Sequence, residues 1–354
     1  MSLNTTDFEY DLPVGLIAQV PSEVRDEARL MCLQRDGGAI AHHVFRELPG
    51  LLVKGDLLVV NDTRVIPARF QCRRSTGGRI EGLLVRELSR GHWNVMLRNA
   101  GRCRLREILQ IDGPGKVEIH LEKKLAGGHW LVRINPANDA VQVLADAGMT
   151  PLPPYIHRGD KSQEASDRSR YQTIFASHAG AAAAPTAGLH FTEKVLADLA
   201  KAEIELACVT LHVGPGTFAP VKCENIIEHQ MHKEWYELPA ETALLINRAR
   251  RQGRRIVAVG TTSVRVLEAA GRSGGELSQA SGWTDLFLYP PAEFHVVDAL
   301  ITNFHLPRST LLMLVAAFCS PGGLGGVSLI LKAYQEAIRQ GYRFYSYGDA
   351  MFIE

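Results

Sequence analysis

The chain has 354 residues, of which 46% are hydrophobic and 22% are charged, and its formal net charge is +1. This composition is typical of a globular protein with enough chain for two or three domains, and it excludes a generally basic protein. No run of about 18 apolar residues occurs, and the six cysteines form no CxxC pair, so we expect no membrane span, zinc ribbon or disulfide framework.

The chain opens on MSLNTTDFEYDLP, which carries acidic residues rather than a basic region followed by an apolar one. Secretory signals have that basic and then apolar order, so we expect a cytoplasmic protein. A buried strand is predicted at residues 57–60, the apolar run LLVV that follows Gly55 and Asp56. The polar cluster NDTR, which contains Asp62 and Arg64, comes directly after this strand and is the first candidate for a functional strand end.

The pattern changes over residues 66–134, where short alternating runs such as RIEGLLVREL, HWNVMLRN and HWLVRIN are separated by STGG, DGPG and AGG. Such spacing is typical of an all-β barrel or sandwich. A helix is predicted at residues 139–147, and the Pro-rich PLPPYI after it indicates a return to the main domain. We therefore predict an α/β fold with a mixed sheet, built from residues 1–65 and 151–354 and interrupted by an inserted β-barrel domain at residues 66–150.

Arginine dominates the charge of the predicted barrel. Ten arginines and no lysine lie between Arg69 and Arg106, and only two glutamates oppose them. The forked guanidinium group suits phosphate oxygens, so this domain could face a nucleic acid. An outer face exposed to water would account for the same residues, because strands of a barrel must present one polar face. The sequence leaves both interpretations open, with Arg98, Arg102 and Arg104 as the candidates for RNA contact.

Two motifs, PTAGLHFT at residues 185–192 and HVGPGT at residues 212–217, bracket one predicted helix and one predicted strand. Thr192 is a candidate N-cap, so the helix should begin just after residue 191. Residues 206–213 have the pattern of a buried strand, and the turn with Gly214 and Gly216 ends it. In a layered α/β unit the helix start and the strand end share one sheet edge, so we expect His190 and His212 to be neighbours.

Residues 161–170, KSQEASDRSR, are predicted to form a polar loop. Further on, His229, His232 and Glu234 have a spacing that a metal could use, but no other His or Cys lies nearby, so we expect no metal. A helix is predicted at residues 241–251 and a strand at residues 255–260, which opens into the hydroxyl cluster TTS and a second helix. Those hydroxyls either cap this helix or leave its amides free for an anion.

Residues 284–289 and 299–304 are predicted strands, and an apolar helix, STLLMLVAAF, follows the second. Five polar segments, NDTR, HVGPGT, GTTS, NFHLPRST and YGDA, each follow a predicted strand. Because α/β sheets bind ligands at the carboxyl ends of their strands, these segments predict one ligand site. The motifs GxGxxG and GxxxxGK[ST] are both absent, so the usual dinucleotide and nucleoside triphosphate sites have no local support.

Seven motifs in this order resemble the S-adenosylmethionine:tRNA ribosyltransferase-isomerases of queuosine biosynthesis. They are DFEYDLPVGLIAQVP, VVNDTRVIPARF, PTAGLHFT, TLHVGPGTFAPV, VGTTSVRVLE, YPPAEFHVVDALITNFHLPRSTLLMLVAAF and SYGDAM. The resemblance spans nearly the whole chain. It implies the same fold that the spacing predicts, a main α/β domain interrupted by a β-barrel.

The resemblance also implies an unusual reaction. S-adenosylmethionine would serve as co-substrate and donate its ribosyl part to the aminomethyl-7-deazaguanine base at the wobble position of tRNA, giving epoxyqueuosine and releasing adenine and methionine. The partner would be a tRNA with a GUN anticodon, and we expect no membrane contact and a monomer. Such chemistry requires a base for a proton on the 5′ carbon and an acid for the departing adenine.

Imidazoles titrate near neutrality, so His190 and His212 are the leading candidates for proton transfer, with Asp62 and Glu234 as carboxylate alternatives. The remaining candidates would bind the ribose hydroxyls, the methionine carboxylate or the anticodon backbone, or would form loop contacts. These substrate-binding candidates are Arg64, Thr186, Gly214, Gly216, Thr217, Arg265, Asn303 and His305.

Two other classes of protein compete with this interpretation. An S-adenosylmethionine-dependent RNA methyltransferase would use the same donor, but it should usually show a Gly-rich loop after its first strand, and none is present. A noncatalytic RNA-binding protein would need only the arginine-rich barrel, so the polar strand ends would have no purpose. Release of adenine distinguishes the ribosyltransferase from both.

Overall fold

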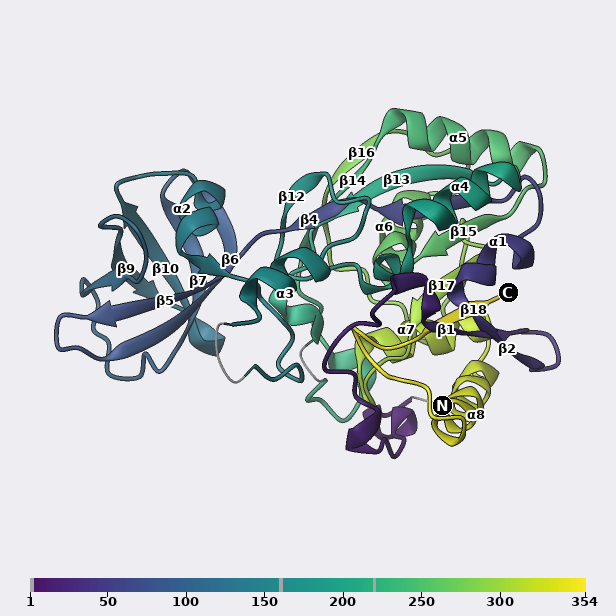
Figure 1. Cartoon of the computed structure of the whole chain (residues 1–354), viewed down its shortest axis with the longest axis horizontal. Helices are drawn as coiled ribbons and strands as arrows, with labels where there is room; N and C mark the ends of the chain where they lie inside the picture. The colour runs from purple at the N-terminus through teal and green to yellow at the C-terminus, as the bar shows by residue number, and fades with distance from the viewer. Residues whose placement is uncertain (1–2, 159–161, 219–220) are drawn as a thin grey trace.

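The computed structural model describes residues 3–158, 162–218 and 221–354. Figure 1 shows a barrel at one end of the molecule and a larger α/β part at the other, joined by strands and loops between them. The predicted fold class, a mixed-sheet α/β domain interrupted by an all-β barrel, is confirmed.

The main sheet lies in the α/β part. Its strands are β1 (Arg29–Leu33), β2 (Ile40–Val44), β3 (Leu57–Asn61), β13 (Glu205–Leu211), β14 (Glu234–Leu238), β15 (Ile256–Val259), β16 (Ala280–Thr284), β17 (Ala299–Asn303) and β18 (Ala350–Ile353). In the described part of the chain they form a nine-stranded sheet in the order β16-β14-β13-β3-β15-β17-β18-β1-β2. The four central strands β13, β3, β15 and β17 run parallel, so their carboxyl ends meet at one edge.

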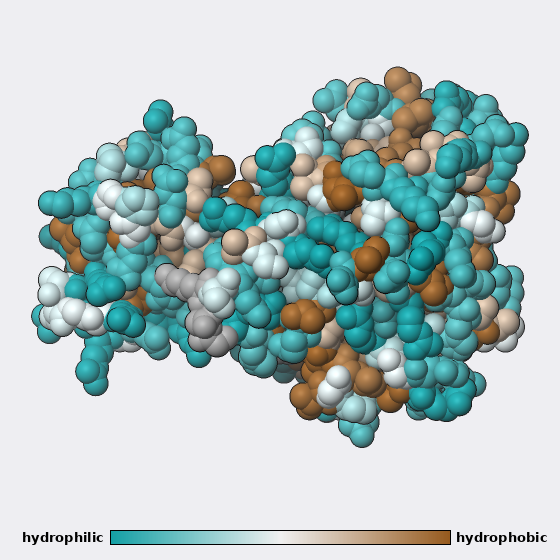
Figure 2. Space-filling model, in the orientation of Figure 1, coloured by the Kyte–Doolittle hydropathy of each residue, from teal (hydrophilic) through white to brown (hydrophobic). Residues whose placement is uncertain are grey.

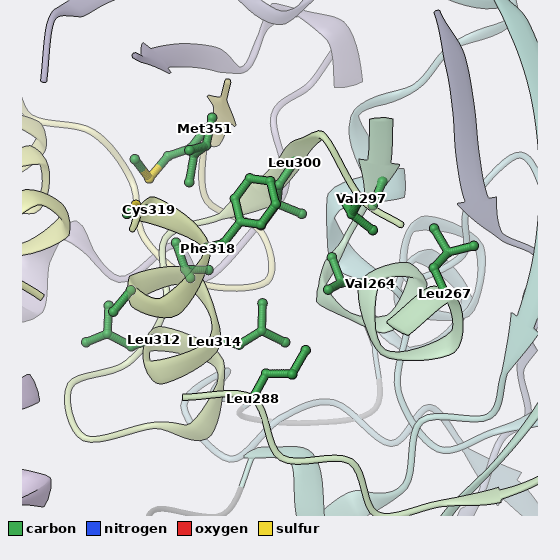
Figure 3. Close-up of a cluster of buried hydrophobic side chains, with 14 of the residues drawn as sticks. Val264, Leu267, Leu288, Val297, Leu300, Leu312, Leu314, Phe318, Cys319 and Met351 are labelled. Carbon is green, nitrogen blue, oxygen red and sulfur yellow. The ribbon is translucent and has the colours of Figure 1, made fainter. Parts of the chain in front are cut away.

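Helices cover both faces of this sheet because successive side chains of each buried strand point to opposite faces. On one face, Leu58 and Val60 pack with α1 (Leu48–Leu51) and α4 (Glu193–Lys201). On the other, Leu57 and Val59 belong to the largest apolar cluster. That cluster includes side chains of α5 (Ala240–Arg251), α6 (Thr261–Gly271), α7 (Thr310–Cys319) and α8 (Gly325–Arg339). Figure 3 shows part of it, where Phe318 lies beside Leu300.

The barrel has its own core. Its strands are β5 (Arg69–Arg74), β6 (Arg79–Ser89), β7 (His92–Arg98), β8 (Ile108–Ile111), β9 (Glu118–Lys124) and β10 (His129–Asn135). All neighbours are antiparallel, and β5 pairs with both β6 and β8, which closes the barrel. Inside, Phe70 packs edge to face on Trp93, and a side chain at Gly82 would overlap the Phe70 ring. The helix α2 (Ala140–Ala147) is capped by Asp139, and β11 (Gly148–Met149) extends the barrel beside β5.

Shorter elements join these parts. A two-stranded parallel sheet of β4 (Thr63–Val65) and β12 (His178–Ala181) lies between the barrel and the main sheet. The 3₁₀ helices are η1 (Thr5–Phe8), η2 (Val14–Leu16), η3 (Arg25–Glu27), η4 (Phe45–Glu47), η5 (Ala126–Gly128), η6 (Thr186–His190), η7 (Pro215–Phe218) and η8 (Ile226–Glu228).

Three local predictions were wrong. Residues 164–170 of the predicted polar loop form the helix α3 (Glu164–Arg170), in which Asp167 pairs with Arg158 and Glu164 accepts from Thr150. Tertiary contacts therefore override the polar composition. The strand predicted at residues 284–289 is instead β16, which ends at Thr284 and pairs with β14. The segment YGDA precedes β18 rather than following a strand. Residue 161 of the loop, and residues 219 and 220 of the motif TLHVGPGTFAPV, lie outside the described residues.

Candidate active site

The five polar segments meet at one edge of the main sheet. NDTR, HVGPGT, GTTS and NFHLPRST follow the parallel strands β3, β13, β15 and β17, as the strand order requires. β18 runs antiparallel to β17, with Ala350 opposite Asn303, so YGDA enters the sheet at this same edge. Glu234 also lies here, because β14 begins where its antiparallel neighbour β13 ends.

A pocket of about 380 Å³ opens at this edge and is called the edge pocket below. Aromatic, aliphatic and hydroxyl-bearing side chains line it together. They are Pro154, Tyr155, Thr186, Thr217, Asn303, Phe304, His305, Leu306, Pro307, Ser309, Leu311, Tyr345 and Ser346. Four of the predicted substrate-binding residues are among them, namely Thr186, Thr217, Asn303 and His305. Apolar walls with a few placed polar groups suit a flat heterocycle with polar substituents.

Asn303 is held at the end of β17 by two contacts of its amide nitrogen. Nδ2 lies 3.2 Å from His190 Nε2 and donates to the carbonyl oxygen of Asp349 at 3.3 Å. The other amide atom, Oδ1, is buried and has no hydrogen-bond partner among the described residues. Buried polar atoms are normally satisfied, so Oδ1 is a free acceptor at the end of β17.

His190 is deeply buried, and its environment favours a positioning role over proton transfer. Burial lowers its pKa to about 4, and the nearby cation of Arg343 acts in the same direction. Its ring centroid lies 5.1 Å from that of Phe45, and the Arg25 backbone nearby opposes the fall of its pKa. The imidazole is therefore neutral near pH 7, with its Nε2 engaged by Asn303.

His305 is also neutral. Burial lowers its pKa to about 3, and Nε2 lies 2.8 Å from Thr302 Oγ1. Its backbone amide donates to the hydroxyl of Tyr334, which fixes the wall of the edge pocket on this side. His305 therefore contributes shape and a hydrogen-bonded backbone to the pocket rather than a charge.

Glu234 and Arg265 form a buried ion pair behind the edge pocket. Glu234 Oε1 also accepts from the amide of Gly214 at 2.7 Å and from Thr217 Oγ1 at 2.6 Å. Arg265 comes from α6 and donates its Nε to the Leu286 carbonyl, while its Nη2 has no partner among the described residues. The pair thus fixes the HVGPGT loop and carries Thr217 into the pocket wall.

Gly216 in the same loop approaches another side chain closely. A Cβ at this position would overlap the ring of His232. His229 packs its ring against Phe287 at 5.4 Å, and Glu234 is engaged by Arg265. Across residues 3–158, 162–218 and 221–354 no group of three His, Cys, Asp or Glu side chains could hold a metal ion, and His229, His232 and Glu234 are no exception.

A second polar cluster, called the His-Asp cluster below, lies where β3 and β13 meet β12. Asp62 is buried and accepts from Thr210 Oγ1 at 2.6 Å, while its other carboxylate oxygen lies 3.1 Å from Nδ1 of His178. The His178 side chain is 60% exposed, so most of the ring is open to solvent. His178 had no signal in the sequence, because it stands at the start of the featureless stretch HAGAAAA.

His212 belongs to this second cluster. Its Nδ1 lies 2.7 Å from Thr63 Oγ1, and its ring stacks on Trp235 with the centroids 5.1 Å apart. Burial and the adjacent His178 lower its pKa, whereas Asp62 opposes the shift. The contacts of His212 and those of His190 share no residue, so the two imidazoles belong to different parts of the edge.

The remaining predicted groups have local roles. Arg64 is exposed and donates to the Ala176 carbonyl at 3.1 Å. The hydroxyls of the TTS cluster do not cap α6, since Gly260 occupies the N-cap position. Ser263 instead donates back to the Val259 carbonyl, and Thr262 Oγ1 is a further buried hydroxyl without a partner in the described chain.

On the barrel, Arg98, Arg102 and Arg104 are exposed, and none of their guanidinium groups pairs with a carboxylate in the described structure. Arg98 lines a second pocket, of about 470 Å³, between the barrel and residues 151–154. This pocket shares Pro154 with the edge pocket. Figure 2 shows a largely hydrophilic barrel surface and a notch between the barrel and the α/β part. In the described part of the chain, no helix is long and apolar enough to cross a membrane.

Comparison with known proteins is consistent with this geometry. A family model described as "Queuosine biosynthesis protein" matches residues 5–353. The chain is 49% identical over 347 residues to the S-adenosylmethionine:tRNA ribosyltransferase-isomerase of Carboxydothermus hydrogenoformans, covering 98% of both proteins. It is 47% identical over 350 residues to the protein of that name from Pelobacter propionicus, covering 98% of this chain and 99% of the relative. It is also similar to the crystal structure of S-adenosylmethionine tRNA ribosyltransferase from Thermotoga maritima, with 38% identity, a TM-score of 0.56 and coverage of 98% and 100%.

Proposed function

Because the chain belongs to the queuosine biosynthesis family of S-adenosylmethionine:tRNA ribosyltransferase-isomerases, we propose that the edge pocket binds the adenosyl part of its donor. The chain is a tRNA-modifying transferase and isomerase that uses S-adenosylmethionine as a substrate. A methyltransferase is not favoured, since the relatives carry the ribosyltransferase name over nearly their full length.

The observation that carries the proposal for the pocket is the convergence of Thr186, Thr217, Asn303 and His305. These four residues come from three separate motifs, yet they line one cavity at the carboxyl edge of the sheet. The rings of Tyr155 and Tyr345 lie in the same wall with their centroids 4.7 Å apart. Such an aromatic wall suits an adenine ring. The predicted loop residues Gly214 and Gly216 act indirectly, because they shape the loop that presents Thr217.

In the proposed reaction the ribosyl part of the donor moves to the aminomethyl nitrogen of the 7-deazaguanine base at the wobble position. A base takes a proton from the 5′ carbon, which the adjacent sulfonium acidifies, and an acid protonates adenine as its glycosidic bond breaks. Methionine leaves as the sulfonium bond to carbon breaks, and the product carries an epoxycyclopentanediol ring. The aminomethyl nitrogen must be neutral when it attacks.

Among the four catalytic candidates, the surroundings favour Asp62 and His212 over His190 and Glu234 for proton transfer. Asp62 holds the exposed His178 through Nδ1, the arrangement in which a carboxylate orients an imidazole whose other nitrogen can exchange a proton. Glu234 is fully engaged by Arg265, Gly214 and Thr217, so we assign it a positioning role. Arg265 then positions Glu234 through their ion pair. Arg64 stabilises the backbone at Ala176, to whose carbonyl it donates.

We further propose that the barrel, residues 66–150, is a separate tRNA-contacting domain of a monomeric, cytoplasmic enzyme, with residues 1–65 and 151–354 as the catalytic domain. Arg98, Arg102 and Arg104 supply unpaired charge for phosphate oxygens, and the second pocket leads from Arg98 to Pro154 at the rim of the edge pocket. An anticodon loop with the sequence GUN would bring its first base to that rim.

Isotope labelling tests the proposed reaction. The enzyme receives donor labelled either in the methyl group or in the ribose carbons, together with tRNA that bears the aminomethyl-deazaguanine base. We expect ribose label in the recovered RNA, no methyl label, and free adenine in equal amount with modified tRNA. Methyl label in the RNA, or S-adenosylhomocysteine among the products, would restore the methyltransferase. Tight tRNA binding without adenine release would indicate a noncatalytic RNA-binding protein.

A further inference from the structure

We propose that Asn303 determines which purine the donor carries, by accepting a hydrogen bond from the 6-amino group of adenine through its Oδ1 atom. This inference rests on the proposed function, because it takes the edge pocket to be the site of the adenosyl group. It attributes the discrimination between a 6-amino and a 6-oxo purine to the Oδ1 atom of Asn303.

The orientation of the Asn303 amide follows from its neighbours. The Asp349 carbonyl oxygen can only accept a hydrogen bond, and it lies 3.3 Å from one of the two amide atoms of Asn303. That atom must therefore be the NH₂ group, and the remaining atom, which no described donor reaches, must be the oxygen. Asn303 lines the edge pocket, and the unpartnered atom of its amide is an acceptor and not a donor.

His190 reinforces this orientation. Because the Asn303 NH₂ group donates its second hydrogen toward His190 Nε2, that nitrogen must be the unprotonated one. The proton of the neutral ring then lies on Nδ1. Burial lowers the pKa of His190 to about 4, so the ring keeps this arrangement throughout the neutral range. A flipped amide would lose both contacts of the NH₂ group.

A buried acceptor selects a ligand group that donates. The 6-amino group of adenine donates, whereas the 6-oxo group of hypoxanthine places a second acceptor against Oδ1. Sites built around such a hydrogen bond reject the analogue that lacks it strongly, because a buried polar atom is then left unpaired. The rings of Tyr155 and Tyr345, which line the same pocket, supply the apolar faces that a purine requires.

The test compares four donors by equilibrium binding to the whole enzyme: S-adenosylmethionine, its deaminated 6-oxo analogue, and its 2′-deoxy and 3′-deoxy analogues. We expect the 6-oxo analogue to bind the wild-type enzyme at least about 100-fold more weakly than S-adenosylmethionine. In Asn303→Leu, which keeps the size of the side chain and removes its oxygen, the two should differ less than about 5-fold. Asn138→Leu, the same substitution at a barrel residue that does not line the edge pocket, should keep the wild-type ratio.

Equal binding of the amino and oxo donors to the wild-type enzyme would overturn the inference, and this result needs no variant to fold. Discrimination that survives in Asn303→Leu, or in Asn303→Ser if the first variant is unfolded by circular dichroism, would also overturn it. The inference would also be overturned if the wild-type enzyme bound only the 2′-deoxy or the 3′-deoxy donor more weakly than S-adenosylmethionine, and if this difference in affinity disappeared in the Asn303 variants. Oδ1 would then serve a ribose hydroxyl. Leu311→Trp fills the pocket and so tests the proposed donor site separately from the role of Asn303. Unchanged donor binding in this variant would show that the edge pocket is not the donor site.

Discussion

In the barrel, the guanidinium groups of Arg98, Arg102 and Arg104 are exposed and have no carboxylate partner in the described structure, whereas at the sheet edge the guanidinium of Arg265 is buried against Glu234. Exposed charges act over a distance of about 10 Å and are screened by salt. Buried, paired groups act at contact distance and depend on exact placement by their neighbours. The comparison supports the two proposals made above, that the barrel attracts a polyanion and that the edge binds a small ligand.

The largest effect should come from breaking the buried pair. Glu234→Ala leaves the Arg265 cation buried without its partner and releases Gly214 and Thr217, so we expect a loss of about 3–5 kcal/mol in the free energy of unfolding. Urea denaturation measures it. Glu237→Ala, on the same strand but without an ion pair in the described chain, should cost far less. Equal losses in both variants would mean that the pair does not stabilise the edge.

The next largest effect concerns the His-Asp cluster. His178→Gln and Asp62→Asn should each reduce turnover by roughly 100-fold while tRNA affinity is retained, because a general acid or base would be lost or misoriented. His43→Gln is the matched control, since His43 also contacts a carboxylate, Glu47, at 2.9 Å but on the surface of β2. If His178→Gln turns over normally, proton transfer must be sought at His212 or elsewhere.

Acid should weaken the edge through its buried histidines. The folded-state pKa values of His190 and His305, about 4 and about 3, lie below the value of about 6.5 expected in the unfolded chain. The unfolded state therefore binds more protons, and stability falls as the pH drops below about 6.5. Each histidine should account for about 2 kcal/mol between pH 7 and pH 5. Urea titrations at both pH values should show a smaller fall in His305→Gln, and an unchanged fall would contradict the assignment.

The smallest effect on a folded enzyme is expected in the barrel. Replacing Arg98, Arg102 and Arg104 together by Ala should lower the slope of log affinity for tRNA against log salt by about 0.9 for each lost contact to duplex-like phosphate. The control replaces Arg69, Arg73 and Arg133, which pair with Glu81, Asp112 and Glu122. Both triple variants lose the same charge, so equal slopes would mean that the barrel acts only through net charge.

The sequence sufficed for the convergence of the strand ends, because parallel strands must place their carboxyl ends together. It also sufficed for the start of α4, where Thr192 accepts from the Val195 amide as an N-cap should. It did not show that His190 is buried between Phe45 and Asn303, since burial depends on contacts far apart in the chain. Nor could it reveal His178, which owes its interest to Asp62, 116 residues earlier in the chain.

The failed local predictions have the same physical cause. The strand β16 has the sequence ASGWT, which is weak in apolar residues, and it exists because Trp283 and its neighbours pair with β14. The helix α3 is polar apart from Ala165, but Asp167 is buried beside its ion-pair partner Arg158. In both elements the tertiary partner, rather than the local pattern, decides the structure.

The separate roles proposed for the barrel and the sheet edge are tested most directly with two variants, one altered in each region. The affinities for S-adenosylmethionine and for tRNA are measured on both. Leu311→Trp should weaken donor binding by at least about 10-fold, because it occupies the edge pocket, and should leave tRNA affinity at low salt unchanged. The triple variant of Arg98, Arg102 and Arg104 should do the opposite. If either variant binds both ligands equally more weakly, or if the triple variant binds only S-adenosylmethionine more weakly, the two regions do not have the separate roles assigned to them.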